Sequence, residues 1–297
     1  MVVAMFGFAV EDSLIKLMAD DVPSGQILIM IGIGGTIIFA IAAKSQGQQP
    51  FGLWMLTGFS GLRAICEGLA ALGYVTALAL VPISLVTTIM QASPLLITLG
   101  AAVFFKHAVG WRRWIAILVG LIGVLIVLRP FGTAFQPAAL FAVMGVSFMS
   151  ARDLATRQIT KNISTLQLSV IGFMATIPAG ILSLTLSGSV PTVPTGLTLI
   201  YLAGAISIGV PALYCIISAM RIGDIAFISP FRYSRIIFGL LAGLLVFGET
   251  LDGYTLLGAA IIVASGTFTL WREARLRRAS QTSPSAVSTT SLPLTSH

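Results

Sequence analysis

Charged and aromatic side chains interrupt several long apolar stretches of this chain. A charge at the middle of a lipid bilayer costs at least about 2.5–3.5 kcal/mol, so a charge that is kept there is a candidate for binding. Arginine donates paired hydrogen bonds to carboxylates or phosphates, and a carboxylate accepts hydrogen bonds or a proton. The candidate residues for binding a small solute are Glu11, Asp12, Arg63, Glu67, Arg232, Tyr233 and Arg235.

Two of these arginines lie three residues apart in the segment SPFRYSR, so Arg232 and Arg235 share one helix face. Because like charges repel, this face requires acidic partners, for which Glu11, Asp12, Glu67 or an anionic group of the solute are available. We expect the face to present guanidinium groups to an anionic or strongly polar group. Pairing with the acids of the first helix is the alternative.

Three tyrosines lie in apolar segments, namely Tyr74, Tyr214 and Tyr233. Each could stack on a flat aromatic ligand, or pack in the interior with its hydroxyl group hydrogen bonded.

Acids and bases also recur at a spacing of four residues, which places each pair on one helix face. The pairs are Asp12 with Lys16, Arg63 with Glu67, and Asp153 with Arg157. We expect Lys16, Asp153 and Arg157 to act in gates or in structural ion pairs.

Two prolines, Pro94 and Pro230, fall inside expected helices. Proline removes a helical hydrogen bond and clashes with the preceding turn, so each predicts a kink. Carbonyl groups freed there could contact a solute, or the kink could serve packing alone.

Motifs of enzymes and metal sites are missing from the sequence. The two histidines, His107 and His297, are far apart, and no H-E-x-x-H or G-x-S-x-G motif occurs. We therefore expect no catalytic residues, no metal and no cofactor.

The composition indicates a protein that is embedded in a lipid bilayer. The chain has 297 residues, of which 57% are hydrophobic and only 9% are charged, whereas soluble domains have about 25% charged residues. The net charge of +7 could suggest nucleic acid. The basic residues cluster at helix ends instead, which favours the lipid bilayer as the partner.

Ten segments are long and apolar enough to cross a bilayer, which takes about 20 residues. They are 1–20, 24–43, 54–80, 83–105, 112–129, 136–157, 164–187, 196–220, 225–247 and 254–271. The first segment begins at Met1, and its charges argue against a signal peptide, although a start further upstream is an open alternative. The Ser/Thr-rich tail, 279–297, is expected to be disordered.

The ten segments divide into two similar halves, 1–130 and 136–272. At an offset of 141, the matching landmarks are Asp12 with Asp153, Lys16 with Arg157, and Gln26 with Gln167. An odd number of helices per half inverts the second copy in the membrane, and inverted repeats are typical of secondary transporters. The fold class predicted is an all-α membrane protein with ten transmembrane helices in two inverted five-helix repeats.

Four candidate residues break the symmetry between the halves. At an offset of 142, Arg63, Glu67, Arg232 and Arg235 match Ala205, Gly209, Met90 and Ser93. A site for an asymmetric solute should break the symmetry in this way.

Basic residues orient the helices, because cytoplasmic loops carry the Lys and Arg. With both termini inside, the basic residues on the inner side are Lys44, Lys106, Arg112, Arg113, Arg157, Lys161, Arg221, Arg272, Arg275, Arg277 and Arg278. The outer side has only Arg129. We expect the N-in, C-in orientation.

Several segments resemble the EamA repeat of the drug/metabolite transporter superfamily. They are the stretch from Gly61 that includes Ser93-Pro94, WRRWIAILVGLIGVLIVL from Trp111, and SPFRYSRIIFGLLAGLLVFGETL from Ser229, with its Gly248-Glu249 ending. The segments EDSLIK and SPFRYSR look closest to a bacterial subgroup of S-adenosylmethionine and riboflavin carriers. Lys106-His107 departs from the family's Gly-Glu pattern in the first half.

The resemblance implies a multi-pass carrier of the bacterial inner membrane that moves a small polar organic metabolite by alternating access. The substrate could be riboflavin-like, S-adenosylmethionine-like or amino-acid-like. It further implies a cavity between helices one, three, four, six, eight and nine. Proton coupling through Glu11, Asp12 or Glu67 is open, as is the choice between monomer and homodimer. The alternatives are a lipid-carrier flippase and a non-transporting membrane subunit.

Overall fold

The computed structural model describes residues 1–106, 110–130, 135–159, 163–222 and 229–282, and these form helices and connecting turns without a strand. The first part contains α1 (Val2–Met18), α2 (Ser24–Ser45), η1 (Leu53–Leu56), α3 (Gly58–Leu80), α4 (Ile83–Met90), α5 (Ser93–Phe104) and α6 (Trp111–Leu128). The second contains α7 (Ala139–Gln158), α8 (Thr165–Ser187), α9 (Gly196–Ile222), η2 (Ser229–Tyr233), α11 (Ser234–Leu245) and α12 (Gly253–Thr282). The all-α prediction is confirmed for these residues.

Eight helical segments of the described chain have the length and hydropathy of a membrane span. One segment expected to span is shorter, since α1 has 17 residues. Of the expected span 225–247, η2 with α11 covers 229–245, and 225–228 lie outside the described residues. The C-terminal helix α12 continues to Thr282, past the start of the tail that we expected to be disordered.

The expected span 83–105 is interrupted near its middle. The helix α4 ends at Met90, and α5 begins at Ser93, with Pro94 in its first turn. Proline is tolerated in a first turn because the N–H groups there have no acceptor within the helix. The predicted kink is therefore a break between two short helices. Pro230 lies in η2, a 3₁₀ segment that leads directly into α11.

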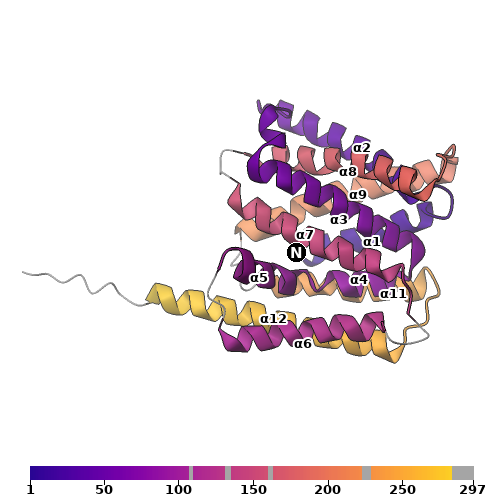
Figure 1. The fold of residues 1–297 in the computed structure, drawn as a ribbon. Helices are drawn as coiled ribbons and strands as arrows, with labels where there is room; N and C mark the ends of the chain where they lie inside the picture. Colours follow the sequence, from indigo (N-terminus) through magenta and orange to yellow (C-terminus); the bar gives the residue numbers. More distant parts are fainter. Residues whose placement is uncertain (107–109, 131–134, 160–162, 223–228, 283–297) are drawn as a thin grey trace, which may run out of the picture.

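The helices pack in pairs that bring distant parts of the chain together (Figure 1). The pairs are α2 with α8, α3 with α7, α1 with α9, α4 with α11, and α6 with α12. Glycines permit the closest crossings, since a Cβ at Gly25 would lie 2.6 Å from the Gly180 carbonyl oxygen, and one at Gly258 would lie 2.7 Å from that of Gly123. Small residues at such contacts are typical of helix pairs in membranes.

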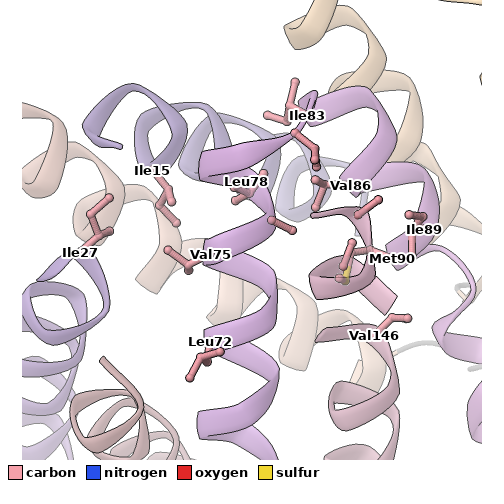
Figure 2. Packing of buried hydrophobic residues seen from close by; sticks show 14 of the residues in the cluster. Ile15, Ile27, Leu72, Val75, Leu78, Ile83, Val86, Ile89, Met90 and Val146 are labelled. Atoms are coloured by element: carbon pink, nitrogen blue, oxygen red, sulfur yellow. The ribbon is translucent and has the colours of Figure 1, made fainter. Parts of the chain in front are cut away.

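The main apolar core lies where α1, α3, α4 and α7 meet (Figure 2). Its members Leu78, Ile83 and Ile89 are completely buried. Large apolar residues such as Phe104 and Leu118 are exposed on the outside, as expected where lipid replaces water. Residues of α2, α6 and α12 also belong to this core, so it joins helices from both parts of the chain.

Two pairs of helix ends share an unusual backbone conformation. Gly47 and Gly188 both adopt positive φ, as do Lys106 and Gly248. Lys106 adopts φ 51° at a steric cost, because a side chain disfavours the left-handed region. Gly47 and Gly188 are 141 residues apart, and Lys106 and Gly248 are 142 apart. These are the two offsets at which the halves of the sequence match.

Candidate functional site

An ion pair joins α1 to α11 inside the bundle. An Arg235 Nη atom lies 2.7 Å from Oδ2 and 2.9 Å from Oδ1 of Asp12, and it donates to the Tyr74 hydroxyl at 2.8 Å. The Asp12 side chain is 2% exposed, and the Phe8 ring covers the guanidinium with its centroid 5.2 Å away. We call Asp12, Tyr74 and Arg235 the Asp12 cluster.

A second group of charges joins α3 to α7. Glu67 lies 2.7 Å from an Arg152 Nη atom and 3.3 Å from an Arg63 Nη atom, and Arg152 also binds Asp153 at 2.8 Å. We call Arg63, Glu67, Arg152 and Asp153 the Glu67 cluster. The expected spacing pair of Arg63 and Glu67 is therefore confirmed, with Arg152 as an additional partner.

Arg63 also anchors the Glu67 cluster to neighbouring helices. It donates to the Thr156 hydroxyl at 3.1 Å and to the Leu168 carbonyl at 2.9 Å. A Cβ at Gly172 of α8 would lie 3.3 Å from Glu67 Oε2, so this glycine leaves room for the ion pair. Every member of the cluster has a partner, which fixes α3 against α7 and α8.

The two clusters lie at different depths. Along α3, Tyr74 is seven residues beyond Glu67, which corresponds to about 10 Å. Each cluster carries equal numbers of positive and negative charges. Neutral clusters of this kind lower the cost of burying ionisable groups in a membrane protein.

Arg232 and Glu11 differ from the residues of the clusters. Among the described residues, neither side chain has a hydrogen bond or an ion pair within 4 Å. The Arg232 guanidinium, which is partly buried, interacts electrostatically with Asp153, Arg152 and Arg235 at longer range. Glu11 also interacts electrostatically with Arg235. Glu11 and Arg232 thus both interact with Arg235 at longer range.

The Glu11 carboxylate lies against the backbone of α9. A Cβ added to Gly209 would lie 2.6 Å from Glu11 Oε1. Only a glycine therefore accommodates the carboxylate in this position. The groups that face it are Asp12 on its own helix, Tyr74 of α3 and Arg235 of α11.

Arg232 lies where two interrupted elements meet. The side chain of Gln91, in the break between α4 and α5, donates to the Arg232 carbonyl at 3.2 Å. Arg232 belongs to η2, at the change from 3₁₀ to α-helix that begins α11. Irregular backbone inside a membrane protein is tolerated where it is buried in protein or lines a cavity.

Two predicted spacing pairs are wrong. Lys16 does not bind Asp12 but donates to the Leu78 and Val81 carbonyls at 3.0 and 2.7 Å, at the end of α3. A cation there stabilises the exposed carbonyls and the negative end of the helix dipole. Asp12 instead binds Arg235, one of the pairings expected for that arginine.

Asp153 likewise binds the adjacent Arg152, while Arg157 is exposed and has no ion pair among the described residues. Arg152 is the member of the site that spacing rules missed. Its position beside Asp153 in an apolar segment was the available signal.

Tyr233 points away from both clusters. Its side chain is buried, its hydroxyl has no hydrogen-bond partner among the described residues, and it contacts Gly266 of α12. Its predicted part in binding therefore stays a prediction, whereas Tyr74 contacts the charged residues directly. The side chain of Tyr214 lies outside the part of the chain that the structure describes.

Glu249, which ends the Gly248-Glu249 motif, caps the start of α4, a contact that the motif alone did not predict. Its carboxylate accepts from the Ile83 amide at 2.6 Å and from the Ser84 hydroxyl at 2.7 Å, at the start of α4. An acid at a helix N-terminus satisfies free N–H groups and complements the helix dipole. Lys16 and Glu249 thus hold the two sides of the α3–α4 turn.

Within the described residues, no three His, Cys, Asp or Glu side chains are grouped to hold a metal ion. A helical membrane protein that buries neutralised charges beside interrupted helices belongs to the class of solute carriers.

Comparison with known proteins agrees with this class. The model of the EamA-like transporter family matches residues 1–129. A riboflavin transporter of Vibrio cholerae serotype O1 is 32% identical over 239 residues, which cover 79% of this chain and 77% of the relative. A riboflavin transporter of Rhizobium johnstonii is 34% identical, over 71% of this chain and 70% of the relative.

More distant relatives carry another substrate name. An S-adenosylmethionine uptake transporter of Rickettsia bellii is 24% identical over 66% of each chain. A solved crystal structure at 20% identity shares the fold, with a TM-score of 0.57 over 93% of this chain and 98% of the other. The chain belongs to the EamA-like transporter family and is a multi-pass transporter of the bacterial inner membrane.

Proposed function

We propose that this transporter consists of two inverted five-helix repeats, 1–130 and 136–272, with ten spans and both termini in the cytoplasm. The packing supports the proposal. When each helix is exchanged for its counterpart five spans away, the α3–α7 pair becomes α9–α1, and α2–α8, α4–α11 and α6–α12 map onto themselves. Two pairs of residues with positive φ agree with the same exchange of helices. They are Gly47 with Gly188 and Lys106 with Gly248, separated by the repeat offsets of 141 and 142.

Two equivalent glutamines give independent support. Gln26 of α2 donates to the Thr192 carbonyl at 2.7 Å, in the segment before α9. Its counterpart Gln167 of α8 donates to the Gln49 carbonyl at 2.8 Å, in the segment before α3. In an inverted repeat these two contacts lie at opposite faces of the membrane. Each ties a helix of one half to the segment that precedes a span of the other half.

The transporter binds its substrate between Glu11 and Arg232. The observation that carries this proposal is that these two charges lack ion-pair partners among the described residues, while the charges around them are paired. Arg232 also lies where the two interrupted elements meet. Discontinuous helices at a repeat interface are the usual substrate site of secondary carriers, which work by alternating access.

The substrate class is a small organic metabolite with both hydrogen-bond donors and acceptors. Riboflavin is the first candidate, because two relatives at 32% and 34% identity are named riboflavin transporters. Its ring carbonyls would accept from Arg232, and its ribityl hydroxyls would donate to Glu11. The Phe8 and Tyr74 rings, which flank Arg235, provide aromatic surface nearby.

S-adenosylmethionine is the second candidate, and a specific feature favours it. Glu11 and Arg232, which have no ion pair among the described residues, match the ammonium and the carboxylate of an amino-acid group. Relatives with this substrate name are less similar, at 24–25% identity.

A coupling proton would bind Glu11. Asp12 and Glu67, the other acids considered, are held in ion pairs at 2.7 Å, so protonating either one would break a buried pair. Protonating Glu11 breaks no such pair within the described part of the chain.

Uptake into proteoliposomes tests the proposed function. The panel contains riboflavin, S-adenosylmethionine, aromatic amino acids and carboxylates, each with and without an inward pH gradient. We expect saturable riboflavin uptake that competing S-adenosylmethionine inhibits weakly. Saturable uptake of S-adenosylmethionine alone would favour the second candidate, and no uptake of any water-soluble solute would overturn the proposal.

A further inference from the structure

A groove on the lipid-facing side lies between α6 and α12. These helices pack together at one edge of the molecule (Figure 1), away from both charge clusters. The groove has a volume of about 460 Å³ and is lined by residues that include Ile115, Val119, Ile261, Ala264 and Phe268. Binding pockets for small molecules typically range over about 300–1,000 Å³.

The walls of the groove offer little to a polar ligand. The hydroxyl of Ser265 already donates to the Ile262 carbonyl at 3.0 Å. Ile115, Val119 and Phe268 are between 39% and 49% exposed. The groove therefore suits a hydrocarbon chain that enters from the surrounding bilayer.

One end of the groove is strongly basic. Arg112 lines the groove and lies over the Trp111 ring at 5.4 Å, and Arg275 lies over the Trp271 ring at 5.6 Å. The two helices are antiparallel neighbours, so both Arg–Trp pairs lie at the same end. Tryptophan prefers the membrane–water interface, which places the two guanidinium groups at the level of the lipid headgroups.

We propose that this groove is a binding site for an anionic phospholipid, with an acyl chain between α6 and α12 and the phosphate at Arg112 and Arg275. From Trp111 to Val119 the groove extends about 12 Å into the hydrocarbon region. Basic pockets between transmembrane helices at one membrane face bind anionic headgroups. A neutral lipid would fill the groove without neutralising the arginines.

The charge also argues against a second copy of this chain as the occupant. A symmetric dimer places the same surface patch on both sides of its interface. Such a contact would bring the Arg112 and Arg275 pairs of two copies toward one another. An anionic lipid neutralises Arg112 and Arg275, whereas a second copy of the chain would bring like charges together.

Native mass spectrometry of the purified full chain tests the site, with phosphatidylglycerol as the probe and phosphatidylcholine for comparison. Arg112→Gln and Arg275→Gln should each lower phosphatidylglycerol affinity about five-fold, since each arginine near an anionic surface contributes about 1 kcal/mol. Ala264→Trp should fill the groove and reduce the occupancy of the lipid while leaving the charge unchanged.

Matched controls separate this site from general attraction to the membrane. Arg157→Gln removes an exposed arginine of α7, and Ala260→Trp adds the same bulk on α12 outside the groove. Neither control should change lipid occupancy. Equal affinity for the two lipids, equal losses in the controls, or a dimer that Ala264→Trp dissociates would overturn the proposal.

Discussion

The α3–α7 and α1–α9 interfaces occupy equivalent places in the proposed repeat, yet they carry different charges. At α3–α7, Glu67 and Arg152 form an ion pair at 2.7 Å. By the offsets that match the two halves, the residue equivalent to Glu67 is Gly209 of α9, and the residue equivalent to Arg152 is Glu11 of α1. One interface is closed by opposite charges, and the other presents a carboxylate to a glycine.

In our proposal, this difference separates charges that hold helices together from charges that bind the substrate. Glu67 and Arg152 neutralise each other and hold two helices together. Glu11 has kept its position beside α9 without a cation at ion-pair distance among the described residues. In the proposed repeat, a position at which the two halves differ would give an asymmetric substrate a place to bind.

The largest effect is expected from breaking the closed interface. Arg152→Met leaves Glu67 and Asp153 without their shared cation, and breaking a buried pair costs about 3–5 kcal/mol. The free energy of unfolding should fall accordingly in detergent, measured by thermal or denaturant unfolding. The double variant Glu67→Gln with Arg152→Met should recover much of the loss.

Arg157→Met is the control for this prediction. Because Arg157 is exposed and has no described ion pair, its replacement should change stability by less than about 0.5 kcal/mol. Equal losses for Arg152→Met and Arg157→Met would mean that the Glu67 cluster does not hold α3 to α7.

The next largest effect is expected for Arg232, which has no ion pair among the described residues. Arg232→Gln should lower the initial rate of uptake at least about tenfold, equivalent to about 1.4 kcal/mol. Its thermal stability should be unchanged or slightly raised, because it breaks no ion pair with any residue that the structure describes. Uptake by this variant is compared with that of Arg157→Gln, and similar rates in the two would remove Arg232 from the site.

A smaller effect is expected from the glycine that faces Glu11. Gly209→Ala places a methyl group 2.6 Å from Oε1 of Glu11 and should displace the carboxylate. We expect KM for uptake to rise roughly fivefold, equivalent to about 1 kcal/mol. Gly196→Ala, on the same helix but with no neighbour within 4 Å of its Cβ, should leave KM unchanged. An equal rise in KM for both variants would count against a specific contact between Gly209 and Glu11.

The smallest effects are expected where the two halves agree. Gln26→Leu and Gln167→Leu each remove one equivalent set of hydrogen bonds, which contributes about 0.5–1.5 kcal/mol to stability. Both variants should lower the free energy of unfolding in this range without a selective loss of uptake. A loss in only one of them would weaken the assignment of the two glutamines as counterparts.

Sequence patterns predicted neighbours on one helix better than neighbours on different helices. Arg63 and Glu67 pair as their spacing of four indicates, because helix geometry alone brings them together. Lys16 and Asp12 have the same spacing but bind α3 and α11, because partners on other helices compete with the local one. Such contacts depend on the register between helices, which spacing within one helix does not encode.

The break near Pro94 shows a similar division. Proline predicted a disturbance of the helix, and the interruption falls at Gln91 and Ala92, just before it. The contact of Gln91 with the Arg232 carbonyl was not predictable, because it joins residues that are far apart in the chain. The kind of site was thus visible in the residue types, and its arrangement required the fold.

The most direct test of the central claim is the uptake rate of Glu11→Gln in proteoliposomes, with the solute that the panel shows to be transported. This variant keeps the size of the side chain and removes its charge and its ability to release a proton. If Glu11 is the binding carboxylate, the initial rate falls at least about tenfold at unchanged thermal stability. An uptake rate equal to that of the natural chain, with the same response to a pH gradient, would contradict the account.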